Sequence, residues 1–538
     1  MTRPAKRHRS QWLRAADHAF DRIARRQGLS IVSVGLVALI AAATLSLLGR
    51  MPQPYVQDEF SYLLAADTFA HGRLTNPTHP MWVHFESFQI LQQPTYSSKY
   101  PPGQGLILAA GQIIAGHPIV GVWLGIALGC AAICWMLMAW LPPRWALLGG
   151  LIATVHPPIL GDWSQNYWGG AVAMTGGALV LGALRRLIPQ PRARDGVVLG
   201  LGMAILANSR PYEGFVLSLL VSAALLVWAL GRNGPAWRVT LGRMALPVCL
   251  VLLPTAAAMS YYNFRVTGDP LRMPYVIHGE AYGIAPPLLW QKPQPEPQFR
   301  HLVFRVAAQI GMMDYLEQRS LGGILIHARI KIRRLATEFF QSWGLAIPLI
   351  VLPWALRRDR WMRLALLIAG LFLASLFLET WVLAHYAAPV MALVLAISLL
   401  AMRHLYEWRR RDRPLGRWIV HASVALCFAG GVIESIRIAG EETYSQQFGL
   451  HRAKMISDLK KLGGKHLVVV RYSPQHNPDH EWVYNDAAID DATVVWAREM
   501  DRERDQKLLD YFHDRKVWLL KTNVDGWPNP APYEPAPR

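Results

Sequence analysis

Apolar runs long enough to cross a bilayer alternate with short polar loops over most of the chain. The first run, residues 31–48, follows 30 residues that hold eight Lys or Arg and two Asp. A bilayer core of about 30 Å needs roughly 20 apolar helical residues, so this run predicts an uncleaved anchor with a cytoplasmic N-terminus rather than a signal peptide. Further spans are predicted at 118–140, 145–160, 169–186, 196–209, 212–230, 242–262, 344–356, 362–380, 385–402 and 418–438.

Basic loops between these runs set the predicted orientation. Lys and Arg accumulate in cytoplasmic loops of membrane proteins, and eleven spans counted from a cytoplasmic N-terminus place every strongly basic loop inside and the C-terminus outside. The count requires that Gly105–Gly116, which is too short to cross, is a half-helix lining a cavity. The basic loops are Arg185–Arg194, Arg232–Arg243, Arg357–Arg363 and Arg403–Arg417.

After residue 440 the chain acquires the composition of a soluble domain. Residues His466–Tyr472, Thr493–Ala497 and Lys516–Leu520 predict buried strands, and Tyr444–Leu462 and Asp501–Phe512 predict helices. We therefore divide the chain into a basic cytoplasmic N-terminus (1–29), an all-α polytopic membrane domain (30–440) with outer loops 50–103 and 263–343, and a small α/β extracytoplasmic domain (441–538).

Composition and charge narrow the class of protein. The 538 residues are 52% hydrophobic and only 17% charged, with a mean hydropathy of +0.19, so membrane lipid must cover much of the surface. The net charge is +19, yet residues 441–538 carry a balance of −2 and the remainder +21. Because this excess lies in loops between spans, it indicates membrane topology and no nucleic-acid partner.

The four cysteines lie inside apolar runs and predict no disulfide framework.

Polar residues that could carry chemistry gather in segments that this topology places outside. The first outer loop holds Asp58 and Glu59, followed by Tyr62, at the start of an amphipathic helix, and it closes with Lys99–Pro102. Successive helical residues point about 100° apart, so the two carboxylates cannot face one substrate atom equally. One could act as a base while the other orients it, or the pair could cap the helix N-terminus.

Other outer segments add charged and aromatic residues near span ends. Arg210 and Glu213 lie where two spans meet, Glu379 follows a span, and His385 and Tyr386 begin the next. Charges are costly at the bilayer centre but tolerated at an interface, so Arg210 could instead snorkel to the membrane surface. A histidine at a span end, such as His385, could equally be a structural residue.

A carboxylate with nearby cations at the membrane surface suits transfer from a phosphate on a lipid carrier. A polyprenyl phosphate is a good leaving group, which needs cations more than a general acid. The acceptor hydroxyl needs a base, and a carboxylate can serve. Lipid tails can reach such a site sideways between helices.

The order of these motifs resembles the GT-C integral-membrane glycosyltransferases, particularly the protein mannosyltransferase and lipid A aminoarabinose transferase branch. The resemblance covers roughly residues 30–440. It rests on the acidic pair Asp58-Glu59 with Tyr62, on a Lys-x-Pro-Pro-like element at Lys99–Pro102, and on a basic-Tyr-x-x-Pro element at His385–Pro389. The extra tyrosine after Lys99 departs from the pattern, as does His385 where relatives often have Arg.

The resemblance implies Asp58 as the catalytic base, Glu59 in a supporting role, and Lys99 with Arg210 or His385 near the carrier phosphate. It implies inversion at the sugar carbon, a polyprenyl-phosphate-linked sugar donor, and a glycan, lipid or protein acceptor. We therefore expect an inverting glycosyltransferase at the outer face of the cytoplasmic (inner) membrane, without a cofactor, although the sequence leaves a divalent metal open. The expected catalytic residues are Asp58 and Glu59, and the expected substrate contacts are Tyr62, Lys99, Arg210, Glu213, His385 and Tyr386.

Two other functions compete with this expectation. A lipid or solute transporter, or flippase, predicts ionisable residues near the middle of the membrane, whereas those here lie at span ends. A non-catalytic assembly or sensor protein would act through residues 441–538. Within that domain, Arg471–Glu481 and Asp486–Asp491 hold His and carboxylate residues that could bind a metal or form a polar loop over the catalytic mouth.

Overall fold

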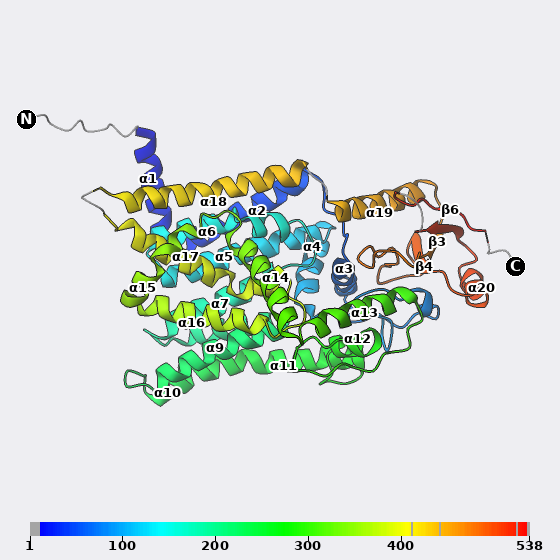
Figure 1. The fold of residues 1–538 in the computed structure, drawn as a ribbon, viewed down its shortest axis with the longest axis horizontal. Helices are drawn as coiled ribbons and strands as arrows, with labels where there is room; N and C mark the ends of the chain where they lie inside the picture. Colours follow the sequence, from blue (N-terminus) through cyan, green and yellow to red (C-terminus); the bar gives the residue numbers. More distant parts are fainter. Residues whose placement is uncertain (1–10, 410–412, 441–442, 523–525, 535–538) are drawn as a thin grey trace, which may run out of the picture.

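The computed structural model describes residues 11–409, 413–440, 443–522 and 526–534 of an elongated molecule. A bundle of helices that run mostly along the long axis fills one end (Figure 1). The first outer loop, the loop 263–343 and the C-terminal domain fill the other end. Residues 1–10, part of the basic loop Arg403–Arg417, the expected domain boundary at 441 and parts of the C-terminal tail lie outside the described residues.

Helices occupy every predicted span. Among the described residues, six helical stretches are long and apolar enough to cross a membrane: α2 (Gln27–Leu48), α5 (Ile119–Trp140), α9 (Pro211–Leu230), the stretch Trp237–Thr267, the stretch Ala384–Tyr406 and α18 (Leu415–Gly440). The stretch Trp237–Thr267 comprises α10 (Trp237–Thr240), η3 (Leu241–Ala245) and α11 (Leu246–Thr267), and the stretch Ala384–Tyr406 comprises η5 (Ala384–Val390) and α17 (Met391–Tyr406).

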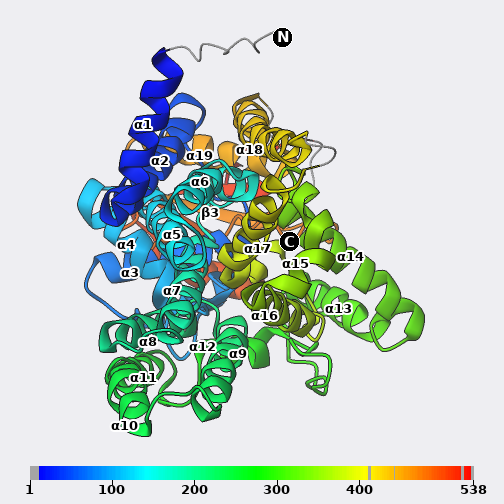
Figure 2. The ribbon, with the colours of Figure 1, turned by 90° about the vertical axis from the view of Figure 1, so that its left-hand side faces the viewer.

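The other predicted spans fall on shorter elements, so the number of crossings stays a prediction. These are α6 (Pro143–Thr154), α7 (Ala171–Leu187), α8 (Ala193–Ala207), η4 (Ile347–Val351) with α15 (Leu352–Arg358), and α16 (Arg360–Leu376). Viewed along the long axis, α5, α7 and α17 lie in the middle of the bundle with the other helices around them (Figure 2). The apolar side chains of α17 are correspondingly buried from Met391 to Met402.

Helix α4 (Pro102–Ala115) occupies the position of the predicted half-helix. It has 14 residues, about 21 Å at 1.5 Å per residue, which is shorter than a bilayer core. Its glycines allow the backbone of α4 to lie very close to that of α5. A Cβ added to Gly111 would lie only 2.0 Å from the backbone nitrogen of Gly121, which leaves no room for a side chain. This backbone contact explains why the segment is rich in glycine, and it fixes the end of the first outer loop against the bundle.

The outer segments contribute short elements around α3 (Gln57–Ala70). The first loop continues with η1 (Trp82–His84) and an antiparallel pair, β1 (Ile90–Leu91) and β2 (Ser97–Ser98). The remaining outer elements are η2 (Pro158–Asp162), α12 (Pro274–Tyr282), α13 (Leu302–Glu317) and α14 (Leu321–Phe340), whereas α1 (Gln11–Arg25) precedes α2 at the opposite end.

The C-terminal domain is the predicted α/β unit. Its four-stranded sheet has the order β4-β3-β5-β6, in which β3 is parallel to β4 and β5, and β6 is antiparallel to β5. The predicted strands and helices are confirmed. They are α19 (Tyr444–Lys461), β3 (His466–Arg471), β4 (Val494–Arg498), α20 (Arg502–Tyr511) and β5 (Lys516–Lys521), with β6 (Ala531–Pro532) added from the tail.

This domain packs directly on the first outer loop. The Ala487 N–H donates to Asp67 Oδ2 of α3 at 2.8 Å, and the Tyr96 hydroxyl donates to the Asn485 carbonyl at 2.6 Å. The Arg498 guanidinium, 1% exposed, donates to the Glu86 carbonyl and to the Glu481 carboxylate, at 2.5 Å each. Glu481, which the sequence offered as a metal ligand, therefore helps to hold the two segments together.

Candidate functional site

Two adjacent carboxylates at the start of α3 have separate surroundings. The Glu59 side chain is fully buried, and its carboxylate accepts backbone N–H groups of Tyr55 (2.9 Å), Val56 (3.1 Å) and Tyr167 (3.0 Å). Burial raises the Glu59 pKa to about 7, although the three N–H groups oppose the shift. Both carboxylate oxygens thus accept backbone N–H groups at the start of the helix, as the capping alternative for this residue expects.

Asp58 instead faces the closing segment of the first loop. Its Oδ1 accepts a hydrogen bond of 2.6 Å from the Tyr100 hydroxyl. The Tyr100 ring stacks on Tyr62, one helical turn beyond Asp58, with ring centroids 4.4 Å apart. The extra tyrosine that interrupts the Lys-x-Pro-Pro pattern is therefore the residue that fixes the Asp58 carboxylate.

Lys99 lies beside the same tyrosine. Its Nζ is 5.0 Å from the Tyr100 ring centroid and 4.7 Å from that of Tyr275 on α12, distances typical of cation–π contacts. Burial lowers the Lys99 pKa to about 8, while the negative charge of Asp58 raises it and Arg210 lowers it further. At neutral pH this buried ammonium remains mostly charged, close to the carboxylate of Asp58.

A close backbone contact brings Arg210 to the same place. The Gly103 N–H, at the start of α4, donates to the Asn208 carbonyl at 2.7 Å, and a Cβ on Gly103 would lie 2.5 Å from that oxygen. Only glycine permits this approach. Lys99 lies four residues before Gly103 and Arg210 two residues after Asn208, and the two cations are within electrostatic reach of each other.

Arg210, Glu213 and Tyr386 form a compact group. The Arg210 guanidinium carbon lies 4.1 Å from the Tyr386 ring centroid, and its Nη1 is 3.5 Å from Glu213 Oε1. Arg210 precedes α9 and Glu213 lies in its first turn, while Tyr386 comes from η5. The Glu213 carboxylate and the tyrosine ring together orient the guanidinium.

His385 lies next to this group but packs as an aromatic ring. Its centroid is 5.5 Å from that of Trp168, with an interplanar angle of 30°, and 5.1 Å from that of Tyr386. The ring is buried at 6% exposure. These ring contacts match the structural alternative for His385.

Sequence reasoning missed Tyr275 and the contact made by Tyr100. Tyr275 belongs to the long outer loop, and its phenol lies within electrostatic reach of Asp58, Arg210 and Glu213. No local pattern distinguishes it from the other tyrosines of the outer segments. The only sequence feature that points to Tyr275 is the length of its loop, because a loop this long commonly covers a functional site.

An apolar groove begins at the Gly103–Asn208 contact. It has a volume of 700 Å³ and lies between α4, α5, α7, α8 and α11. Leu106 and Leu201 line it while remaining exposed on the surface of the bundle, at 54% and 45%. The groove is therefore open at the surface of the helical bundle, and its lining includes the Gly103–Asn208 contact. Lining residues include Pro102, Gly103, Leu106, Leu201, Ala204 and Met259.

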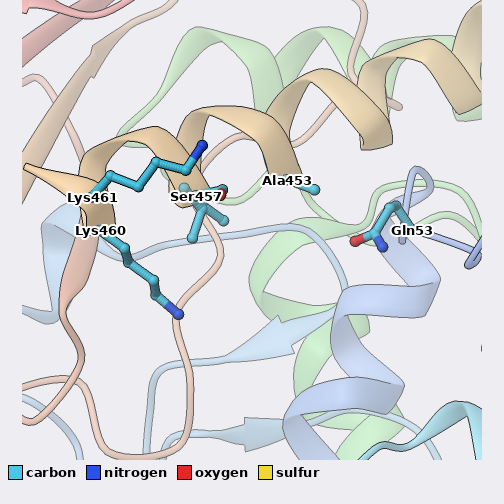
Figure 3. A pocket seen from close by; sticks show the side chains of 6 residues that line it. Gln53, Ala453, Ser457, Lys460 and Lys461 are labelled. Carbon is cyan, nitrogen blue, oxygen red and sulfur yellow. The ribbon is translucent and has the colours of Figure 1, made fainter.

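A second hollow lies apart from these residues. It has a volume of 540 Å³ and lies between Gln53 and helix α19, where Lys460 and Lys461 project beside Ser457 (Figure 3). None of the predicted site residues lines it. Among the described residues, one group of His and carboxylate side chains has the spacing of a metal site, Asp314, Glu317 and His327, and it lies outside the cluster around Asp58.

Comparison with known proteins identifies the fold. No family model matches the sequence, and neither does any curated protein. The structure of ArnT from Cupriavidus metallidurans bound to undecaprenyl phosphate matches with a TM-score of 0.50 at 13% identity, covering 92% of each chain. ArnT in the apo state gives 0.48 at 14% identity, again over 92% of each chain.

The Archaeoglobus fulgidus oligosaccharyltransferase in the apo form gives a TM-score of 0.48 at 10% identity, covering 82% of this chain. This chain spans only 62% of that enzyme's length. At such identities a structural likeness shows the fold and no more. The protein has the GT-C fold of membrane glycosyltransferases, as its motifs predicted.

Proposed function

We propose that this protein is an inverting glycosyltransferase that moves a sugar from a polyprenyl-phosphate carrier to an acceptor hydroxyl at the outer face of the cytoplasmic membrane. One observation carries the proposal: Asp58 and Arg210 lie within electrostatic reach of Lys99, beside the Gly103–Asn208 contact that lines an apolar groove. The chemistry of a base, two cations and an apolar channel matches an acceptor, a phosphate and an isoprenoid chain.

The reaction follows as a single displacement. The acceptor oxygen attacks the sugar C1 while its proton passes to Asp58, and the bond between C1 and the phosphate oxygen breaks with its electron pair on the phosphate. Tyr100 occupies Asp58 Oδ1, which leaves Oδ2 for the acceptor. Lys99 and Arg210 stabilise the phosphate that leaves. One displacement from the face opposite the leaving group inverts C1.

The distribution of charge supports the outer location. The basic loops around α10, α15 and the end of α17 lie at the end of the bundle opposite α3 and the C-terminal domain (Figure 1). Cytoplasmic loops carry such an excess of Lys and Arg. The proposed site then faces the other side of the membrane, where the C-terminal domain covers the first outer loop.

If the groove holds the isoprenoid chain, filling it should weaken the binding of a long carrier lipid more than that of a short one. Ala204→Trp fills the groove, so we expect at least a tenfold loss of affinity for undecaprenyl phosphate and a smaller loss for a carrier of two isoprene units. Ala223→Trp, on the exposed side of α9, is the matched control and should bind both lipids like the wild type. If Ala204→Trp and the wild type bind undecaprenyl phosphate with equal affinity, the groove does not hold the lipid chain.

The buried Lys99 predicts a pH dependence of carrier binding. Its ammonium is charged below the pKa of about 8 and neutral above it, so affinity for undecaprenyl phosphate should fall as the pH rises from 7 to 9. Lys99→Arg keeps the positive charge over this range and should flatten the profile. A wild-type affinity that is constant from pH 7 to 9 contradicts the assignment of Lys99 to the phosphate.

A further inference from the structure

Glu379 lies in the tight turn between α16 and η5, and other groups hold this turn in place. Lys331 Nζ donates to the Glu379 carbonyl at 2.6 Å, and the Thr380 N–H donates to the Pro287 carbonyl at 2.8 Å. Glu379 also pairs through its backbone with Leu288. The turn is thus fastened by backbone contacts to α14 and the long outer loop, and the Glu379 side chain is not what fastens it.

The Glu379 carboxyl is buried without a full set of partners. The residue is 8% exposed, and within the described part of the chain its Oε1 has no hydrogen-bond partner. Buried polar atoms in native folds almost always have a partner. An unpaired carboxyl oxygen of this kind is what a bound ligand would complete.

The charged neighbours of this carboxyl include one cation of the proposed phosphate site. They are Glu213, Arg210 and Lys331, and its field also reaches the phenols of Tyr275 and Tyr386. Arg210 is already within 3.5 Å of Glu213, and Lys331 donates to Gln318 Oε1 and to backbone carbonyls. Neither cation is therefore dedicated to Glu379, whose carboxyl remains available to accept a hydrogen bond.

We propose that Glu379 binds a hydroxyl group of the sugar that is transferred, and so distinguishes the sugar-bearing donor from the sugar-free carrier. The inference rests on the proposed function, because the sugar is bonded to the phosphate that Lys99 and Arg210 would hold. A sugar hydroxyl donates one hydrogen bond and is small enough to reach a buried carboxyl. Glu379 would thus favour the donor over the spent carrier at the same site.

Binding assays on the purified full-length protein test this inference. The probes are undecaprenyl phosphate and three undecaprenyl-phosphate hexoses that carry glucose, mannose or galactose. We expect the wild type to bind at least one hexose lipid more tightly than the bare carrier. Glu379→Ala should lose that preference, weakening hexose-lipid binding about tenfold, the effect of one hydrogen bond, while binding the bare carrier within twofold of wild type. Glu379→Gln, which keeps an accepting oxygen, should retain most of the preference.

Glu338→Ala is the matched control. Glu338 is also buried, at 6% exposure, with an unpartnered Oε1, but its charged neighbour is Asp162 rather than Arg210. This variant should keep the wild-type preference. The inference is overturned if Glu379→Ala keeps the preference, if it weakens both kinds of lipid equally, or if the wild type prefers none of the hexose lipids. A wild type that binds no polyprenyl phosphate at all would instead overturn the proposed function.

Discussion

Replacing Asp58 with Asn is expected to lower the rate of sugar transfer roughly 10²- to 10⁴-fold, the usual contribution of a general base. The asparagine carbonyl oxygen can still accept the 2.6 Å hydrogen bond that the Tyr100 hydroxyl donates to Asp58 Oδ1. The packing of Tyr100 on Tyr62 is therefore preserved, while the negative charge of Asp58 and its ability to take a proton are lost. Transfer under single-turnover conditions in proteoliposomes measures the effect.

Glu59→Gln is the matched comparison because it changes the neighbouring carboxylate. The glutamine side chain has a single oxygen, so its NH₂ group must face a backbone N–H group that now donates to a carboxylate oxygen of Glu59. We expect this variant to lose about 1–3 kcal/mol of stability, seen as a lower thermal midpoint, whereas Asp58→Asn should keep the wild-type midpoint. Full transfer activity in Asp58→Asn would end the assignment of Asp58 as the base.

Removing Arg210 is expected to cause two separate losses. Arg210→Ala leaves the Glu213 carboxylate, 3% exposed, without its cation. An unpaired buried charge destabilises a protein by about 3 kcal/mol or more, and we expect the lower end because the Arg210 side chain is itself 17% exposed. The variant should also lose at least tenfold in affinity for undecaprenyl phosphate, since a hydrogen bond to a charged group contributes about 1.5–3 kcal/mol.

A second substitution separates the two losses. In Arg210→Ala/Glu213→Gln the buried carboxylate is neutral, so the thermal midpoint should return toward the wild-type value while carrier affinity stays low. Recovery of both stability and affinity would mean that Arg210 serves only to neutralise Glu213. Glu213→Gln alone keeps the cation and should bind the carrier at least as tightly as the wild type.

Much of the fold could be predicted because its determinants are local. Hydropathy located the predicted membrane helices between α2 and α18, since each apolar run must form its own backbone hydrogen bonds within lipid. The strand-like runs that became β3, β4 and β5 likewise have buried side chains on both faces of a covered sheet. Motif order also identified the GT-C fold, which the likeness to ArnT confirms.

The details of the site depend on contacts between distant segments, which no local pattern encodes. The cap of Glu59 was an open alternative, but its third donor, the N–H of Tyr167, lies 108 residues away. Tyr100 appeared as an interruption of a motif, and Tyr275 carried no signal, because their roles arise only when α12 and the first outer loop meet. The packing of the C-terminal domain on α3 is likewise visible only in three dimensions.

Cleavage of the bond between the sugar and its carrier phosphate at this site is tested most directly by one measurement. Purified protein in proteoliposomes receives an undecaprenyl-phosphate hexose labelled in both the sugar and the lipid, with a cell-envelope extract as the source of acceptors. We expect free undecaprenyl phosphate to appear in equal amount to sugar-labelled acceptor, and both products to vanish in Asp58→Asn. Labelled lipid that crosses the bilayer intact, with neither product formed, would contradict the account and indicate a transporter.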